Sequence, residues 1–114
     1  KSTVKIITVN PKQKLSLQYH KKRKEFWRFL DNPAKVTIGK KIIKVRKGDE
    51  VIIQKKTLHS VEALNKQVRF LEIAFGNFDE NDIVRIKDIY GRAWFISLSH
   101  HLNHFFFKPK FLII

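Results

Sequence analysis

Apolar and polar residues alternate with a period of two over most of the chain, which is the pattern of β-strands that bury one face. Turn-forming residues such as Asn10 and Pro11 interrupt this pattern every few positions. The pattern predicts eight short strands, at residues 4–9, 15–20, 25–30, 34–38, 41–45, 50–54, 58–63 and 68–75. Eight short antiparallel strands are typical of a jelly roll or small barrel, which leaves few strand edges exposed. We therefore expect an all-β fold.

The pattern changes after Gly76. Residues 79–82 carry side chains that cap helices, and they precede the apolar stretch 83–86, so we expect a short helix or an irregular turn in this segment. The tail, residues 93–114, is interpreted as a covering helix followed by a strand. The sequence thus predicts one barrel domain at 1–92 and a C-terminal tail at 93–114 that packs on the barrel or forms an interface.

The tail also holds three histidines and two apolar clusters. His100 and His104 stand four residues apart, a spacing that binds metal on a helix, but no acidic residue is near them. We interpret them as surface or packing residues. The clusters at 105–107 and 111–114 would leave an apolar patch if they were exposed. We therefore expect a homodimer that forms through these clusters or through outer strands.

The composition fits a single folded domain. The 114 residues are 43% hydrophobic and 12% aromatic, which is enough apolar material for one core. No stretch approaches the roughly 20 apolar residues that span a bilayer, and no start resembles a signal peptide. We expect a cytoplasmic protein without a membrane partner. The chain has no cysteine, so nitrogen and oxygen atoms must hold any metal ion.

The net charge of +14 raises the question of nucleic-acid binding, because clustered Lys and Arg are the usual signature of phosphate contacts. Most basic residues here alternate with apolar ones, as Lys5, Lys35, Lys44 and Arg69 do, and only residues 21–24 form a run. This distribution indicates the solvent-facing sides of strands. Nucleic acid is therefore not the partner we favour, although a positive surface would attract small phosphorylated substrates.

Four polar residues form the candidate chemistry. Gln18 and His20 are two apart on a predicted strand, so their side chains share a face. Glu25 begins the next strand and folds back beside His20, and His59 stands in an otherwise apolar or small strand. Buried polar groups need partners, and a metal ion satisfies all of these donors at once. The donor set suits Zn, Fe, Mn, Co or Ni. On spacing alone, the alternative is four unrelated polar residues on a charged surface.

A resemblance to a known family strengthens the metal interpretation. Residues 15–27 and 34–39 resemble the first cupin motif of the type II mannose-6-phosphate isomerases, in their C-terminal isomerase domain. Residues 48–59 with Glu62 are similar to the second cupin motif, and residues 82–85 and 88–92 resemble the segment that closes that domain. The resemblance covers about residues 4–92. It implies a cupin double-stranded β-helix whose metal ligands are Gln18, His20, Glu25 and His59.

The chain departs from the family pattern at positions that shape turns and surround the ligands. These positions are Phe26, Asn32, Gln54, Lys56 and Ala63. The ligand types themselves are all present. The resemblance therefore implies the metal site more firmly than it implies the activity.

The resemblance implies a metal-dependent isomerase that interconverts mannose 6-phosphate and fructose 6-phosphate. Arg92 and Arg85 are the candidates for the substrate phosphate, since a guanidinium matches phosphate oxygens bidentately. No general base is assigned; Glu72, Lys55 and Tyr19 are candidates if the barrel turns them inward. The alternatives are a cupin that binds metal or sugar without turnover and another cupin enzyme, such as a sugar epimerase.

Overall fold

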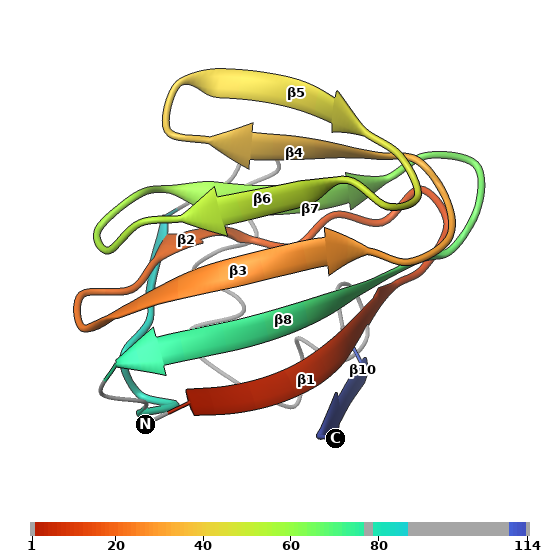
Figure 1. Cartoon of the computed structure of the whole chain (residues 1–114). Coiled ribbons are helices and arrows are strands. Elements are labelled where there is room, and N and C mark those ends of the chain that lie inside the picture. Colours follow the sequence, from red (N-terminus) through yellow and green to blue (C-terminus); the bar gives the residue numbers. More distant parts are fainter. Residues whose placement is uncertain (1, 77–78, 87–109, 114) are drawn as a thin grey trace.

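The chain folds into two antiparallel sheets that face each other, as the computed structural model in Figure 1 shows. The structure describes residues 2–76, 79–86 and 110–113. Sheet A contains β1 (Ser2–Val9), β3 (Arg23–Phe29), β6 (Glu50–Ile53), β8 (Val68–Gly76) and β10 (Lys110–Ile113), in the order β10-β1-β8-β3-β6. Sheet B contains β2 (Leu17–Tyr19), β4 (Ala34–Ile38), β5 (Lys41–Val45), β7 (His59–Ala63) and β9 (Val84–Ile86), in the order β5-β4-β7-β2-β9.

The eight strands that the alternating pattern predicts are present as β1 to β8, which confirms the all-β prediction. The strand β3 begins at Arg23, two residues before the predicted start. Alternate residues of β3 are buried, from Arg23 to Phe29. The early start therefore turns Arg23 inward, although it belongs to the basic run 21–24.

The segment after β8 corrects one prediction. A short helix or an irregular turn was expected in this segment; residues 80–81 do form a turn, but residues 84–86 form strand β9 and not a helix. The backbone of β9 pairs with β2, which would otherwise be the outer strand on that side of sheet B. Pairing satisfies the amide groups of both strands, and this tertiary gain outweighs the local preference for a helix. Residues 87–91 lie outside the described residues.

The end of the tail forms a strand. Strand β10 pairs antiparallel with β1, with Ile6 opposite Leu112. A strand was expected at this end of the tail. Residues 93–109, with the expected covering helix and with His100 and His104, lie outside the described residues, and the boundary at residue 92 stays a prediction.

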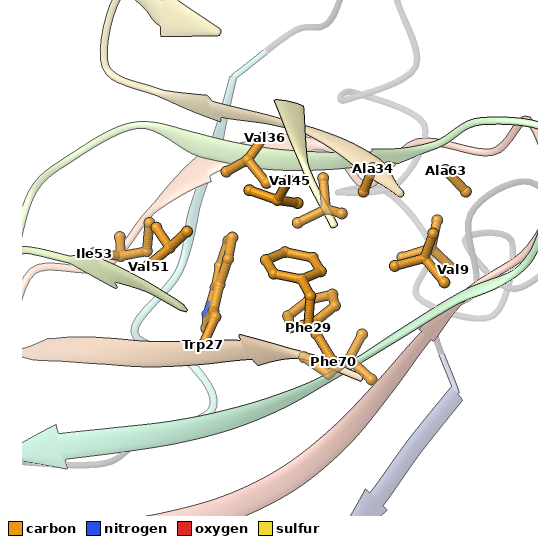
Figure 2. Close-up of a cluster of buried hydrophobic side chains, with 13 residues drawn as sticks. Val9, Trp27, Phe29, Ala34, Val36, Val45, Val51, Ile53, Ala63 and Phe70 are labelled. Carbon is orange, nitrogen blue, oxygen red and sulfur yellow. The ribbon is translucent and has the colours of Figure 1, made fainter. Parts of the chain in front are cut away.

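The apolar core lies between the two sheets (Figure 2). Its largest members are Trp27 and Phe29 of β3 and Phe70 of β8, each at most 2% exposed. Phe29 and Phe70 lie directly opposite each other in the register of sheet A, with ring centroids 5.1 Å apart. Among the residues that the structure describes, none forms a helix long and apolar enough to cross a membrane.

Candidate metal centre

Three side chains of metal-ligand type meet between the sheets, beside the apolar core. They are His20, which follows β2, Glu25 of β3 and His59 of β7, and one ligand atom from each lies within 4.8 Å of the others. All three are buried, with exposures of 3%, 1% and 2%. Buried ionisable groups are costly unless they are paired or bind a metal ion. The cluster therefore calls for an explanation.

The Glu25 carboxylate lies at the centre of this cluster. Its Oε2 is 3.3 Å from His20 Nε2, and its Oε1 is 3.9 Å from His59 Nε2. The indole Nε1 of Trp27 donates a hydrogen bond of 3.0 Å to Oε1, and Arg23 Nε donates one of 3.0 Å to Oε2. These two donors fix the plane of the carboxylate, so each oxygen faces a different imidazole.

Both histidines are oriented in the same way by backbone carbonyls. His20 Nδ1 lies 2.6 Å from the carbonyl oxygen of Asp82, and His59 Nδ1 lies 2.8 Å from that of Thr57. A carbonyl oxygen only accepts hydrogen bonds, so Nδ1 carries the proton in each ring. A neutral imidazole protonated at Nδ1 presents the lone pair of Nε2. Both lone pairs thus face Glu25, as in histidines that bind metal ions.

The pKa shifts favour the protonation states that bind metal. Burial lowers the pKa of His59 to about 4 and also holds the pKa of His20 below its usual value. Burial raises the pKa of the Glu25 carboxyl, but the positive charges of the two imidazoles, which are protonated at the acid pH where Glu25 titrates, and of the Arg23 guanidinium outweigh burial and keep that pKa low. At neutral pH the cluster therefore consists of two neutral imidazoles and one carboxylate.

The donor set fits a divalent metal ion. His59 Nε2 is buried and has no hydrogen-bond partner, as expected for a nitrogen whose partner is a metal ion. Two imidazole nitrogens and a carboxylate suit Zn, Fe, Mn, Co and Ni, as the sequence predicted. A metal ion on this site would satisfy the unpaired nitrogen and neutralise the buried carboxylate.

The fourth predicted ligand, Gln18, lies next to this cluster. It is directly opposite His59 in the pairing of β2 with β7, so the two side chains share a face of sheet B. Its Oε1 accepts a hydrogen bond of 3.3 Å from the Ser16 hydroxyl. The second lone pair of this oxygen is available to a further partner.

Of the two predicted phosphate-binding arginines, Arg85 lies within the described residues and Arg92 lies outside them. Arg85 lies in β9, directly opposite Gln18, so it shares the face of sheet B that carries His59. Its side chain is partly buried, and burial lowers its pKa. The role of Arg92 stays a prediction.

Sequence reasoning missed Arg23. Its Nη2 lies 3.3 Å from His20 Nε2, and its Nε donates to Glu25, so it is part of the cluster. Arg23 is two residues before Glu25, and strand periodicity was the signal that could have placed both on one face. The guanidinium and a metal ion would compete for the His20 lone pair.

Among the three candidate bases, the structure turns Glu72 inward. Glu72 is 6% exposed, lies opposite Lys5 of β1 and Trp27 of β3, and hydrogen-bonds with Glu25. Burial and the neighbouring Glu25 raise its pKa to about 8. Lys55 is exposed, and Tyr19 is only partly buried, on the strand position that alternates with Gln18.

The sequence is similar to that of known proteins. The family described as mannose-6-phosphate isomerase C-terminal matches residues 1–88. The xanthan biosynthesis protein XanB of Xanthomonas campestris is 35% identical over 92 residues, which are 79% of this chain and 20% of that protein. A mannose-1-phosphate guanylyltransferase of Escherichia coli is 36% identical over 92 residues, with 79% and 19% covered. The chain spans about a fifth of the length of these relatives.

Solved structures share the fold. A double-stranded β-helix protein of Klebsiella pneumoniae superposes with a TM-score of 0.67 at 17% identity, covering 76% of each chain. The oxalate decarboxylase of Bacillus subtilis has a TM-score of 0.67 at 22% identity, covering 90% of this chain and 28% of that enzyme. At these identities the likeness shows the fold alone, and it confirms the predicted double-stranded β-helix.

Proposed function

Because this chain belongs to the mannose-6-phosphate isomerase C-terminal family and has the cupin fold, we propose that it is a metal-dependent sugar-phosphate isomerase. Its proposed reaction interconverts mannose 6-phosphate and fructose 6-phosphate. The observation that carries the proposal is the convergence of His20, Glu25 and His59, with a buried and unpaired Nε2 on His59. Gln18 is the proposed fourth ligand.

The reaction moves a proton between adjacent carbons of the sugar through an enediol. A bound metal ion would polarise the sugar carbonyl and favour the developing negative charge. The chain must supply a group that takes and returns the proton. We assign this role to Glu72, because it is the inward-facing member of the three candidates and lies against Glu25.

The substrate phosphate requires cations at the edge of the site. Arg85 supports this role, since it lies two strands from His59 on the same face of sheet B. Arg92 is the second candidate, from the resemblance of residues 88–92 to the family. The relatives named above take part in xanthan biosynthesis or transfer guanylyl groups to mannose 1-phosphate, so a role in supplying sugars for polysaccharides is part of the proposal. The homodimer and the cytoplasmic location stay predictions.

The test is a coupled assay with mannose 6-phosphate, run with added Zn²⁺, Co²⁺ or Mn²⁺. We expect turnover that disappears with a chelator and returns with one of these metals. Glu72→Gln, which replaces the proposed proton carrier, should abolish turnover while the protein still binds metal. If the wild-type chain binds metal and the sugar phosphate but shows no turnover with any metal, it is a binding cupin and the isomerase proposal is wrong.

A further inference from the structure

His20 is held by two chain segments that are far from it in sequence. Its ring Nδ1 contacts the Asp82 carbonyl at 2.6 Å, and its own carbonyl accepts a hydrogen bond of 2.6 Å from Lys56 N. The remaining ring nitrogen, Nε2, faces Glu25 and Arg23. The direction of the His20 lone pair therefore depends on where Asp82 places its carbonyl.

The side chain of Asp82 fixes that place. Its Oδ1 accepts a hydrogen bond of 2.9 Å from the Lys21 amide, and its Oδ2 accepts one of 2.9 Å from the Lys22 amide. Two successive amides that point at one carboxylate form a concave anion site. The carboxylate thus joins residues 79–86, here called the strap, to the turn that immediately follows His20. Asp82 is 9% exposed, so water competes weakly for these hydrogen bonds.

The turn that receives the carboxylate is restricted from its other side. A Cβ added to Gly76 would lie 2.9 Å from the Lys22 carbonyl oxygen, which is closer than packing allows. Gly76 has φ of +110°, a conformation that favours glycine. The backbone of β8 therefore lies directly against this turn. With Asp82 on the amides and Gly76 near the carbonyl, the turn has little freedom to move.

The strap also continues into the sheet. Its last residues form β9, which pairs with β2 so that Val84 lies opposite Tyr19 and Arg85 opposite Gln18. The strap therefore contacts the strand that carries Gln18 as well as the residue that follows it, His20. A displacement of the strap would disturb two of the four proposed ligands together.

We propose that Asp82 is a positioning residue, which acts through His20 to fix the imidazole tautomer that binds metal. The carboxylate ties the strap to the Lys21–Lys22 amides, and the carbonyl of the same residue then accepts the Nδ1 proton. This leaves the Nε2 lone pair facing the centre. The inference rests on the proposed metal site for its purpose, but the tautomer itself is a property of the metal-free protein.

The first experiment reads the tautomer directly in the metal-free chain by long-range ¹H–¹⁵N NMR of the imidazoles. In the wild type we expect both His20 and His59 to be protonated at Nδ1. In Asp82→Ala we expect His20 to become a mixture of tautomers, because the strap no longer holds its acceptor in place. His59 should keep its signals, since its acceptor is the Thr57 carbonyl, and it is therefore the internal control.

The second experiment measures Co²⁺ affinity of the full chain by titration. Loss of the partner that orients a ligating histidine typically costs about 10- to 100-fold in metal affinity, and we expect this loss for Asp82→Ala. Glu80→Ala is the matched control, because it removes the same charge from the same strap at a residue whose side chain is 75% exposed and pairs with Lys5 rather than with the turn after His20. Its Co²⁺ affinity should stay within about two-fold of the wild type.

Asp82→Asn provides a milder variant if Asp82→Ala does not fold. Its amide oxygen still accepts one backbone hydrogen bond, but its NH₂ group cannot accept the second, so we expect an intermediate loss of affinity and a partial change of tautomer. An unchanged His20 tautomer in the folded variants overturns the proposal, even if Co²⁺ affinity falls. If the wild type binds no Co²⁺, the metal site is wrong, while the NMR result still decides the role of Asp82.

Discussion

The two ends of the space between the sheets are built from the same strands but have opposite chemistry. The inward positions of β3 change from Arg23 and Glu25 at its start to Trp27 and Phe29 at its end. On β8, Phe70 lies opposite Phe29, and Glu72 lies opposite Trp27. We call the first region the polar end, which also contains His20, His59 and Glu72. The second is the apolar end, which also contains Val9, Ala34, Ala63, Val68 and Phe70.

Trp27 forms the boundary between these ends. Its ring centroid is 4.9 Å from that of Phe70 and 5.5 Å from that of His59, and its Nε1 donates to Glu25. A tryptophan suits this position because its large apolar surface packs with the core while one polar atom meets the charged cluster. The indole thus lies between the ionisable side chains of the polar end and the aromatic side chains of the apolar end.

The difference between the two ends indicates which of them stabilises the fold and which of them carries the candidate metal site. Burial of apolar surface contributes about 25 cal/mol per Å², so the apolar end supplies most of the folding free energy. The polar end buries several ionisable groups, and replacing such groups with apolar ones is often neutral or stabilising. We therefore expect these groups to serve binding rather than stability.

The largest expected effect is a truncation at the apolar end. Phe70 has 0% exposure and contacts the rings of Trp27 and Phe29. We expect Phe70→Ala to lower the free energy of unfolding by about 3–5 kcal/mol, measured by urea denaturation, because it leaves a cavity. Metal affinity in the folded protein should change little. A loss below about 1 kcal/mol would show that the apolar end does not dominate stability.

A smaller effect concerns Glu72 and the pH dependence of the metal-free protein. Burial and Glu25 raise the pKa of Glu72 from 4.5 to about 8, so the folded state binds a proton that the unfolded state releases. This stabilisation is fully present below pH 4.5 and is lost as pH rises through 8. In Glu72→Gln we expect no such loss. Above pH 8 the free energy of unfolding of the variant should therefore exceed that of the wild type by a few kcal/mol, which is about the amount that this pKa shift implies.

Urea denaturation at several pH values, with a chelator present, checks this prediction. Glu50→Gln is the control, because its side chain and that of its ion-pair partner Arg28 are both about half exposed, so the substitution should leave the pH dependence of the wild type in place. Below pH 6.5 the lowered pKa values of His20 and His59 make stability rise with pH, so the test range for Glu72 lies above that value. A wild-type stability that does not fall from about pH 6.5 to about pH 9 would show that Glu72 is ionised in the folded state. Burying the ionisable groups of the polar end would then cost less folding free energy than we infer from comparing the two ends.

The fold was predictable because each strand buries one face. Alternation therefore located β1 to β8. The same periodicity placed Gln18 and His20 on one face, the positions of Glu25 and His59 on the predicted strands added these two residues, and the family resemblance strengthened the set of four. These predictions needed only local spacing and known motifs.

The remaining features depend on contacts between distant residues. Asp82 looked like a helix cap, but its carboxylate accepts hydrogen bonds from the amides of Lys21 and Lys22, which are 61 and 60 residues away. Arg23 belongs to a run of basic residues in the sequence, but it pairs with Glu25 inside the barrel. The neighbours of Glu72 follow from strand register, which sequence alone did not give.

The central claim is that the polar end holds a metal ion, and metal content measures it most directly. The wild-type chain and His59→Ala should each be loaded with Zn²⁺, dialysed and analysed by inductively coupled plasma mass spectrometry. We predict about one equivalent in the wild type and almost none in His59→Ala, because the variant lacks one of the few donors that the site needs. Equal metal content in the two proteins would contradict the assignment of this centre.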